Sequence, residues 1–592
     1  MIADRRGNPQ RSRDVPSVTA TVGSVDQPEL LDAVVVRTWA HTVVEALDIA
    51  RPELDGVNVF PVADGDTGTN MYLTVREAAG AVHDADAASG GAKLLRVAAR
   101  AALLGARGNS GVILSEWLRG FAVAASRQDT LGVGLDVAAR SARRAVAHPM
   151  PGTILTAADA AAAAARHAEA GGMVGPLGAP RRLSVLDAAR RGAREAALRS
   201  VGSLAPLRDA GVLDAGACGL VLVLASLAAA QQAAGEAGVS PVPGATAPVL
   251  LDMDLRGHAP VGDDMAAEVP ADVAEPESGG LDEVELMFVL HRSADADGFV
   301  PGAVADALRA DLDRVGNSVV VVGGSADDVD SLWQAHVHAP DLDAALAVPR
   351  RWAERGTISH VHVRHLAVPP TDWAVVVTTS APALAAELAT GGAVVLLDLD
   401  TAPAVDDLAQ AAVAAGTPNV LVMASPELLE GLDDAIDDLV ARDVAHGGPG
   451  DQPRLAAVPA PDDVHLVTAV SALAGALDAV RAGGDALDVP GVVLSAHRRL
   501  RADRVAAADA ATAVVRLVEE CEDPGIVAVL PDADVGAVVL GQVVDRAAAC
   551  APGADVVVLA TGRPGDRVGI GVEPVEDVVN DALLPLRDGG GR

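Results

Sequence analysis

Residues 58–71 read NVFPVADGDTGTNM, a run of turn residues and acids between long alanine-rich segments. Asp64 and Asp66 are separated only by Gly65, and side chains two residues apart in an extended segment point the same way. Neighbouring carboxylates repel each other unless a hard divalent cation or bound protons neutralise them. The stretch therefore favours a magnesium site, although an acidic turn before a helix is the ordinary interpretation of an isolated DGD tripeptide.

The residues after the two acids are typical of a helix start that binds an anion. Thr67, Thr69 and Asn70 offer hydroxyl and amide groups beside the free N–H groups of a first helical turn. Gly68 allows the backbone to approach a ligand closely. Together with Met71, which closes the stretch, these residues are candidates for binding the phosphates of a nucleotide.

Three further loops place glycine with hydroxyl, amide or acidic residues before a helix-like segment. The candidate binding residues in GARGNSGVILS (105–115), PGTILT (151–156) and GVLDAGACGL (211–220) are Gly108, Asn109, Ser110, Gly111, Thr153, Asp214 and Gly216. Each loop alone is an ordinary helix cap. If the four loops converge at one end of a helical domain, they form a phosphate pocket. The sequence has no GxxxxGK[ST] motif, so this pocket would lack a P-loop lysine.

Composition limits the classes of function. The 592 residues carry a formal net charge of -36 and only 2% aromatic residues, which argues against nucleic acid and membrane surfaces as partners. Three distant cysteines fit a reducing compartment. The longest apolar run, Cys218–Ala230, is too short to span a bilayer, and the N-terminus lacks an apolar signal segment. We therefore expect a soluble cytoplasmic protein without an integral membrane segment.

The pattern of apolar residues and breakers predicts a multidomain α plus α/β protein. We expect a disordered tail over 1–27, a helical domain over 28–238, a linker over 239–280, a histidine-rich α+β domain over 281–367 and an α/β domain over 370–592. Eight helix-like runs in the first domain predict a helical barrel or bundle. The βαββαβ order of the second predicts a ferredoxin-like fold. In the last domain we expect alternating strands and helices, including a strand over 464–469.

Six of the fourteen histidines fall between 281 and 367. His336 and His338 alternate on one expected strand and so share a face, as do His360 and His362 on another. In the strand order 4-1-3-2, the first strand lies between these two, and its Glu285 would complete a site. Two imidazoles and a carboxylate suit zinc. The alternative is that these histidines line a solvated face of the sheet.

The four loop strings resemble the ATP-binding DhaL domain of dihydroxyacetone kinases and, more closely, the catalytic subunit of bacterial fatty acid kinase. The resemblance covers roughly 28–238 and continues through the middle domain. There, LWQAHVHAPD (332–341) is similar to the family segment W-x-V-H-V-H-T-D-D, which is associated with a bound metal. The family often has cysteine where Glu285 stands. Beyond about residue 370 the resemblance weakens.

This resemblance implies a DhaL-type eight-helix barrel with ATP at its open end. Asp64 and Asp66 would hold Mg²⁺, with Asn58 beside them. The segments 67–70 and 108–111 would cradle phosphates, and Thr153 and 214–216 would lie near the nucleotide. The resemblance further implies a DegV-like lipid-binding partner that presents a fatty acid for phosphorylation on its carboxylate, a degenerate DegV-like C-terminal domain, and a homodimer.

Two other interpretations remain open from the sequence. A kinase of the same fold could phosphorylate a small carbonyl compound or polyol, although the middle and C-terminal regions do not look like the substrate-anchoring domain of dihydroxyacetone kinases. A non-catalytic regulatory protein could bind only nucleotide or metal. The retained acids Asp64 and Asp66 argue against this second alternative.

Overall fold

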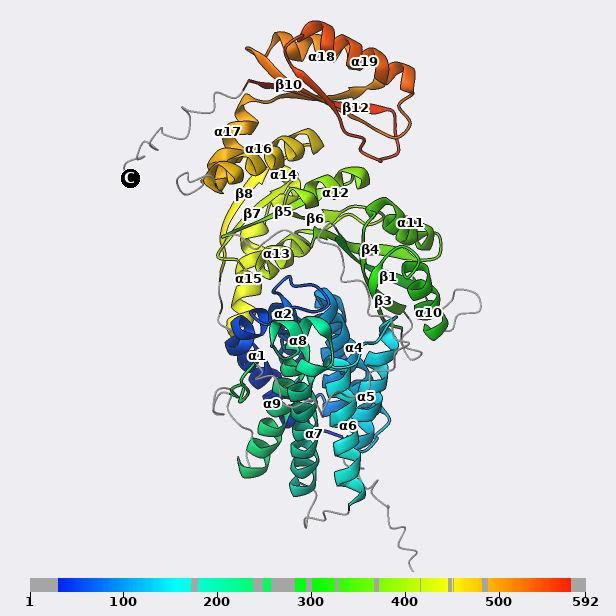
Figure 1. Ribbon diagram of the computed structural model, residues 1–592, viewed down its shortest axis with the longest axis vertical. Coiled ribbons are helices and arrows are strands. Elements are labelled where there is room, and N and C mark those ends of the chain that lie inside the picture. The colour runs from blue at the N-terminus through cyan, green and yellow to red at the C-terminus, as the bar shows by residue number, and fades with distance from the viewer. Residues whose placement is uncertain are drawn as a thin grey trace, which may run out of the picture.

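Three bodies are stacked along the longest axis of the molecule (Figure 1). They are a helical domain, a large mixed sheet with its helices, and a small C-terminal sheet. The computed structural model describes residues 30–171, 179–237, 249–256, 283–293, 301–324, 330–366, 372–415, 417–445, 450, 452–481 and 488–575. The expected tail at 1–27 lies outside these residues, as does the expected linker at 239–280 apart from 249–256.

The helical domain forms a closed ring of helices. Its elements are α1 (Ala33–Asp55), α2 (Thr67–Asp84), α3 (Gly91–Gly105), α4 (Gly108–Ser126), α5 (Leu131–Ala145), α6 (Ile154–Ala170), α7 (Ala179–Arg199), η1 (Ser200–Gly202), α8 (Ala205–Ala210) and α9 (Ala215–Ala237). From α1 to α7, each helix packs against the next along the chain, and α9 packs against both α7 and α1. The long helices correspond to the eight helix-like runs expected from the sequence.

Small side chains allow these helices to pack closely. In α6, buried alanines recur at three- and four-residue spacing from Ala157 to Ala168. A Cβ atom added to Gly120 of α4 would lie only 2.8 Å from the Cα of Ala138 in α5. The backbones of α4 and α5 therefore approach each other at a distance that a larger side chain would prevent.

The helix α9 is more extensive than its apolar run suggested. By length and composition alone, the 21 residues of Ala215–Gly235 would suffice to cross a membrane. Most of this stretch is buried inside the helical domain, between α1, α6 and α7. Cys218–Ala230 is thus only part of a longer apolar helix, whose burial is that of a core helix.

The first half of the large sheet comes from the expected middle domain. Its elements are β1 (Val284–Ser293), α10 (Pro301–Leu312), β2 (Asn317–Gly323), β3 (Asp330–Ala339), α11 (Leu342–Ala353) and β4 (Thr357–His365). The strand order is β2-β3-β1-β4, and all neighbours are antiparallel. The strand β1 therefore lies between the two histidine-bearing strands, as the sequence predicted. Leu286 and Phe288 of β1 are buried in the core that α10 and α11 cover.

The second half of the sheet continues without a break. It consists of β5 (Trp373–Thr379), α12 (Pro382–Thr390), β6 (Ala393–Leu397), α13 (Val405–Ala414), β7 (Asn419–Ala424), α14 (Pro426–Leu429), α15 (Leu432–Ala445), β8 (Arg454–Pro459), α16 (Asp463–Arg481) and α17 (Val489–Arg499). The strand β6 pairs antiparallel with β4, while β6, β5, β7 and β8 run parallel. One core extends from β1 to α17. The boundary expected near residue 370 therefore falls inside one sheet.

The strand expected over 464–469 is wrong, because these residues belong to α16. The carboxylate of Asp462 accepts a hydrogen bond from the backbone N–H of His465 at 3.1 Å, which caps the start of this helix. Buried Leu466, Ala469 and Leu473 then follow at helical spacing. A short apolar run is ambiguous between strand and helix, and the cap decides it. The corresponding strand is β8, ten residues earlier.

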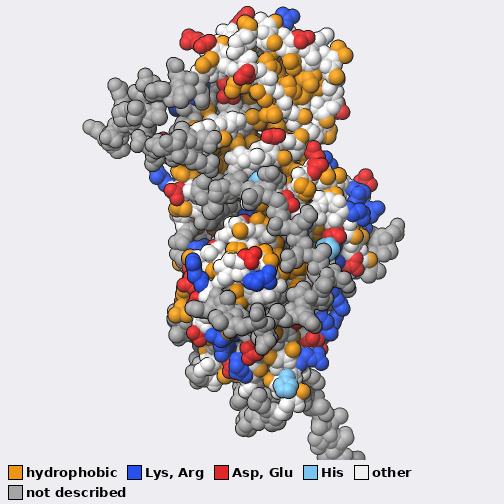
Figure 2. Space-filling model, in the orientation of Figure 1, with side chains coloured by type: hydrophobic (Ala, Val, Ile, Leu, Met, Phe, Trp, Pro, Cys, Tyr) orange, Lys and Arg blue, Asp and Glu red, His pale blue; other side chains and the backbone are white. Residues whose placement is uncertain are grey.

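The C-terminal body has a sheet and core of its own. Its elements are β9 (Arg501–Ala506), η3 (Ala507–Asp509), α18 (Ala510–Glu519), β10 (Pro524–Pro531), α19 (Ala537–Cys550), β11 (Asp555–Val558) and β12 (Arg567–Pro574), with strand order β11-β10-β12-β9. Val514, Val527 and Ile570 belong to its core. Figure 2 shows apolar side chains gathered on this body, where Val538 is 75% exposed. The expected 370–592 domain thus contains two bodies.

One face of the large sheet rests on an end of the helical domain. Met287 of β1 and Val320 of β2 pack against Leu103 of α3 and Val112 of α4. Val146, which follows α5, forms an antiparallel bridge with Val320 at the edge of the sheet. Residues 249–256 also stay with the helical domain, because the carbonyl of buried Leu255 accepts from the backbone of Leu213 at 3.0 Å.

Candidate active site

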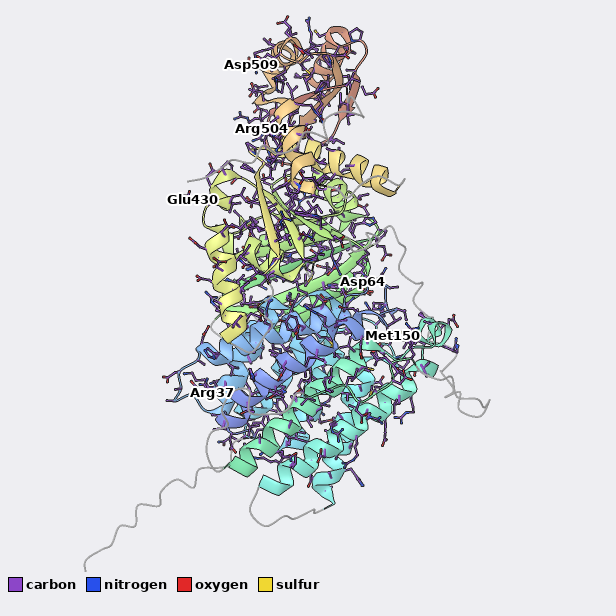
Figure 3. All side chains as sticks on the ribbon, turned by 90° about the vertical axis from the view of Figure 1, so that its left-hand side faces the viewer. Arg37, Asp64, Met150, Glu430, Arg504 and Asp509 are labelled. Carbon is purple, nitrogen blue, oxygen red and sulfur yellow. The ribbon has the colours of Figure 1, made fainter. Side chains whose placement is uncertain are left out.

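A cleft lies where the loop between α1 and α2 meets the sheet. Figure 3 shows Asp64 at this junction of helical domain and sheet. The cleft holds about 280 Å³ of space, part of it open to solvent. It is lined by Asn58, Pro61, Val62, Asp64, Asp66, Thr67, Asn70, Gly108, Asn109, Ser110, His336, His338 and Arg364. Helical and sheet residues therefore form two walls of one site.

Two amide side chains orient the acids of the helical wall. The Nδ2 atom of Asn58 donates to Oδ1 of Asp64 at 2.7 Å, and Nδ2 of Asn70 donates to Oδ1 of Asp66 at 2.7 Å. The turn between the acids depends on Gly65, which has φ of +68° and so adopts a conformation that favours glycine. The loop thus holds two carboxylates side by side in a defined orientation.

The electrostatics of this pair fit a divalent cation. Burial, together with the charge of Asp66, raises the pKa of Asp64 to about 8. The crowded carboxylates therefore need protons or a cation for neutralisation. Carboxylate oxygens are the ligands that Mg²⁺ prefers, and it usually takes one or two of them together with water and phosphate oxygens. Asp64 and Asp66 fit this pattern.

The N-termini of α2 and α4 meet beside the acids. The hydroxyls of Thr67 and Ser110, one from each helix start, are 3.2 Å apart. Gly108 has φ of +52°, and a Cβ atom on it would overlap the side-chain amide of Asn70. Glycine at this position therefore allows α4 to begin directly against α2. Two helix N-termini at one cleft favour an anionic ligand such as phosphate.

The sheet wall contributes a cation and a buried carboxylate. In β1, Glu285 pairs in register with His338 of β3 and with Arg364 of β4. The Nη2 atom of Arg364 donates to Oδ2 of Asp66 at 2.6 Å and to Oδ2 of Asp64 at 3.2 Å. Its Nε atom donates to Glu285. Although burial acts to raise it, Arg364 and the histidines lower the pKa of Glu285 well below its usual value.

Four predicted binding residues lie behind the cleft rather than in its lining. Gly68 packs against Arg51 and Leu54 of α1, and Met71 is fully buried. The backbone N–H and hydroxyl of Thr69 donate to the carboxylate of Asp55 at 3.0 and 2.7 Å. Gly111 lets α4 approach α2 closely, because a Cβ atom there would overlap the Thr74 hydroxyl. These residues shape the helix starts that form the wall.

The other two predicted loops, with Thr153, Asp214 and Gly216, do not line the cleft. The carboxylate of Asp214 accepts from the backbone N–H of Ala217 at 2.7 Å and also from that of Ile154. It therefore joins the starts of α9 and α6. Burial raises the pKa of Asp214 to about 7. The roles predicted for Thr153, Asp214 and Gly216 at a nucleotide stay predictions.

The expected zinc site is not formed. Glu285, His336 and His338 are buried close together, with His336 Nδ1 3.3 Å from the Glu285 carboxylate. Among the described residues, however, no three histidine, cysteine or acidic side chains are arranged to hold a metal. The carboxylate that zinc would need is paired with Arg364 instead. A fixed positive charge at this position replaces the need for a cation.

Arg364 and Asp55 are the site residues that the sequence did not single out. Arg364 follows His362 by two positions, so strand alternation placed it on the histidine face, but nothing local linked it to residues three hundred positions earlier. Asp55 caps α2 from the end of α1. A cap contributed by the preceding helix has no fixed sequence spacing and could not be read from a local motif.

Comparisons with known families match two parts of the chain. The DAK2 domain model matches residues 61–229, and the model for the FakA-like middle domain of fatty acid kinase matches residues 283–368. The first match covers the helical wall of the cleft from Pro61 onward. The second contains Glu285, both cleft histidines and Arg364. Each wall therefore falls within a recognised family module.

Individual relatives agree over part of their length. Protein YloV of Bacillus subtilis is 30% identical over 328 residues, which are 54% of this chain and 53% of YloV. The chain thus spans about half the length of this curated relative. Among solved structures, dihydroxyacetone kinase of C. freundii is 19% identical, with a TM-score of 0.26 over 36% of this chain and 38% of that one. The Streptococcus pneumoniae Fatty Acid Kinase (Fak) B3 protein, loaded with linoleic acid, is 10% identical, with a TM-score of 0.24 over 34% of this chain and 99% of that one.

TM-scores this low carry no argument, so the assignment rests on the sequence matches. The DAK2 domain precedes the middle domain on one chain, and the two modules form opposite walls of the same cleft. With these two modules, the chain belongs to the FakA-like family of fatty acid kinase proteins.

Proposed function

We propose that this protein is an ATP- and Mg²⁺-dependent kinase subunit that phosphorylates the carboxylate of a fatty acid presented by a lipid-binding partner. The observation that carries this proposal is the position of Asp64 and Asp66 beside the N-termini of α2 and α4. Carboxylates bind the metal and helix N-termini bind anions, so the combination suits a metal-bound polyphosphate. The family description supports a kinase subunit.

The residues of the helical wall have distinct roles in this proposal. Bound Mg²⁺ would neutralise charge on the transferring phosphoryl group. Asp64 and Asp66 would hold it, oriented by Asn58 and Asn70. The start of α4 from Gly108 and the Thr67 hydroxyl would bind phosphate oxygens. A carboxylate acceptor is already ionised at pH 7, so the reaction needs no strong general base.

We further read the closed ring of helices as a DhaL-type barrel with the cleft at its open end. The strand order β2-β3-β1-β4 supports a ferredoxin-like unit, and we read the C-terminal region as a degenerate DegV-like fold. The fatty acid, the DegV-like partner, the homodimer and the cytoplasmic location are part of the same proposal. The mostly buried α9 fits a core helix of a soluble protein.

The decisive experiment is a reconstituted phosphoryl-transfer assay with Asp66→Asn. The full chain is mixed with Mg-ATP, oleate and a DegV-like protein from the same genome, and acyl phosphate is trapped with hydroxylamine. We expect Asp66→Asn to lower turnover by about 100-fold or more, comparable to the loss of one preorganised group at a transition state. The matched control is Asp209→Asn, because the side chain of Asp209 is 77% exposed on α8.

Each outcome separates the candidate functions. Partner-dependent acyl phosphate that is lost only in Asp66→Asn supports the proposal. Turnover of a small carbonyl compound or polyol, with none on oleate, would move the acceptor to the other kinase class. Nucleotide binding without turnover on either acceptor would favour a regulatory protein.

A further inference from the structure

We propose that Arg364 is a resident counter-ion of Asp64 and Asp66, and that it exchanges these carboxylates for the phosphates of a bound nucleotide. The inference rests on the proposed function of the cleft and adds a residue from the sheet wall to it. Arg364 is the one arginine or lysine among the residues that line the described cleft. It comes from β4, far in sequence from the helical loops.

Every carboxylate oxygen of the acid pair already has a donor. The two Oδ1 atoms accept from the amides of Asn58 and Asn70, and the two Oδ2 atoms accept from Arg364. A metal ion therefore cannot bind both carboxylates without displacing at least one of these donors. The guanidinium is the donor that carries a positive charge, so a divalent cation would repel it as well as replace it.

The anchoring of Arg364 allows such an exchange. Its Nε atom donates to Glu285, which is 3% exposed and fixed on the central strand β1. The bond to the acid pair uses Nη2 at the far end of the guanidinium. The arginine side chain is 34% exposed, whereas that of Glu285 is 4% exposed. The Glu285 end is therefore held, while the Nη end faces the cleft.

The exchange would supply what the helical wall lacks. A nucleotide tail is a polyanion, and the acid pair by itself repels it. Arginine presents a planar fork of donors that matches phosphate oxygens, and it stays charged at any physiological pH. With a metal on the carboxylates, the freed guanidinium would stand beside the phosphates that the metal binds. Glu285 acts as a positioning residue in this arrangement.

Two binding measurements on Arg364→Gln test the exchange independently of turnover. In the first, Mn²⁺ is titrated into the nucleotide-free full chain and followed by electron paramagnetic resonance. Because the variant lacks the competing cation, we expect Mn²⁺ to bind about 10-fold more tightly than to wild type. In the second, Mg-ATP binding is followed by calorimetry. Because the variant lacks a phosphate contact, we expect binding about 10-fold weaker or more.

The opposite signs of the two effects are the signature of the exchange. Arg314→Gln is the control, because the side chain of Arg314 is 65% exposed and lies outside the cleft. Weaker Mn²⁺ binding in Arg364→Gln would show that the arginine merely holds the acids in place and would overturn the inference. Unchanged Mg-ATP affinity would also overturn it. If wild type binds Mn²⁺ but no nucleotide, the proposed function fails instead.

A second variant guards against loss of folding. Arg364→Lys keeps the charge but has neither Nε nor a planar fork, so it cannot hold Glu285 and the acid pair together. We expect Mn²⁺ affinity closer to wild type than in Arg364→Gln, with Mg-ATP affinity still reduced. Full recovery of Mg-ATP binding by lysine would overturn the role of Glu285 as an anchor.

Discussion

The helical wall and the sheet wall of the cleft are built by different means. The helical wall comes from residues 58–70 and 108–110, whose amides, hydroxyls and acids contact each other across two adjacent helix starts. The sheet wall comes from β1, β3 and β4, and its Arg364 contacts acids 298 and 300 positions earlier. A local motif built the first wall, and a docked domain built the second.

This difference shows what each wall contributes to the chemistry. The helical wall alone offers carboxylates and helix N-termini, which bind metal and phosphate but leave the acids unneutralised. The sheet wall adds the positive charge and closes the cleft. The site is therefore incomplete unless the sheet stays seated on the helices, so the seating contacts matter as much as the ligands.

The largest expected effect breaks the seat of the sheet wall. Met287 is 5% exposed and packs with Leu103 and Val112 of the helical domain. We expect Met287→Ala to lower the free energy of unfolding by about 2–5 kcal/mol, because it leaves a cavity between the domains. Urea denaturation measures the change, and Met287→Leu is the volume-matched control, with a loss below about 1.5 kcal/mol. Equal losses in both variants would contradict a packing role.

A smaller effect is expected when the helical wall is disturbed at Gly108. Alanine there must adopt φ of +52° and would push the amide of Asn70 away from Asp66. We expect Gly108→Ala to lower the free energy of unfolding by about 1–2 kcal/mol and to weaken Mn²⁺ binding. Gly202→Ala is the matched control, because a Cβ atom there meets nothing within 4 Å. If both variants bind Mn²⁺ like wild type, Gly108 does not set the geometry of the acids.

The smallest effect concerns the helix starts outside the cleft. Asp214 has a folded pKa of about 7 against an unfolded value of 3.8, so between these values the folded chain holds the proton more tightly. Its contribution to stability is therefore largest below about pH 4 and is lost as pH rises through 7. Relative to wild type, Asp214→Asn should gain roughly 1 kcal/mol of stability between pH 5 and 8.

Melting temperatures at pH 5, 6, 7 and 8 measure this gain. Asp209→Asn, at an exposed acid, should run parallel to wild type across the same range. A constant difference between Asp214→Asn and wild type would contradict the buried, protonated state of Asp214. It would leave Asp214 available for the nucleotide role that the sequence predicted.

Most of the local structure was predictable because it follows from local rules. The eight long helices, the acids Asp64 and Asp66 and the strand order around β1 all appear where periodicity, turn residues and motif placed them. The strand expected over 464–469 is wrong because the cap at Asp462 was overlooked. The domain boundary near 370 was misplaced because apolar patterning does not reveal that β4 pairs with β6.

By itself, the sequence determined a helical domain with a pair of acids at a helix start, since spacing, glycine turns and capping chemistry act over a few residues. Only the tertiary structure decided which residues share the cleft. It left Thr153 and Asp214 outside the lining, and it placed Arg364 where zinc was expected. Charge pairing between strands and loops depends on how domains dock, and docking depends on contacts such as that of Met287, which have no periodic signature.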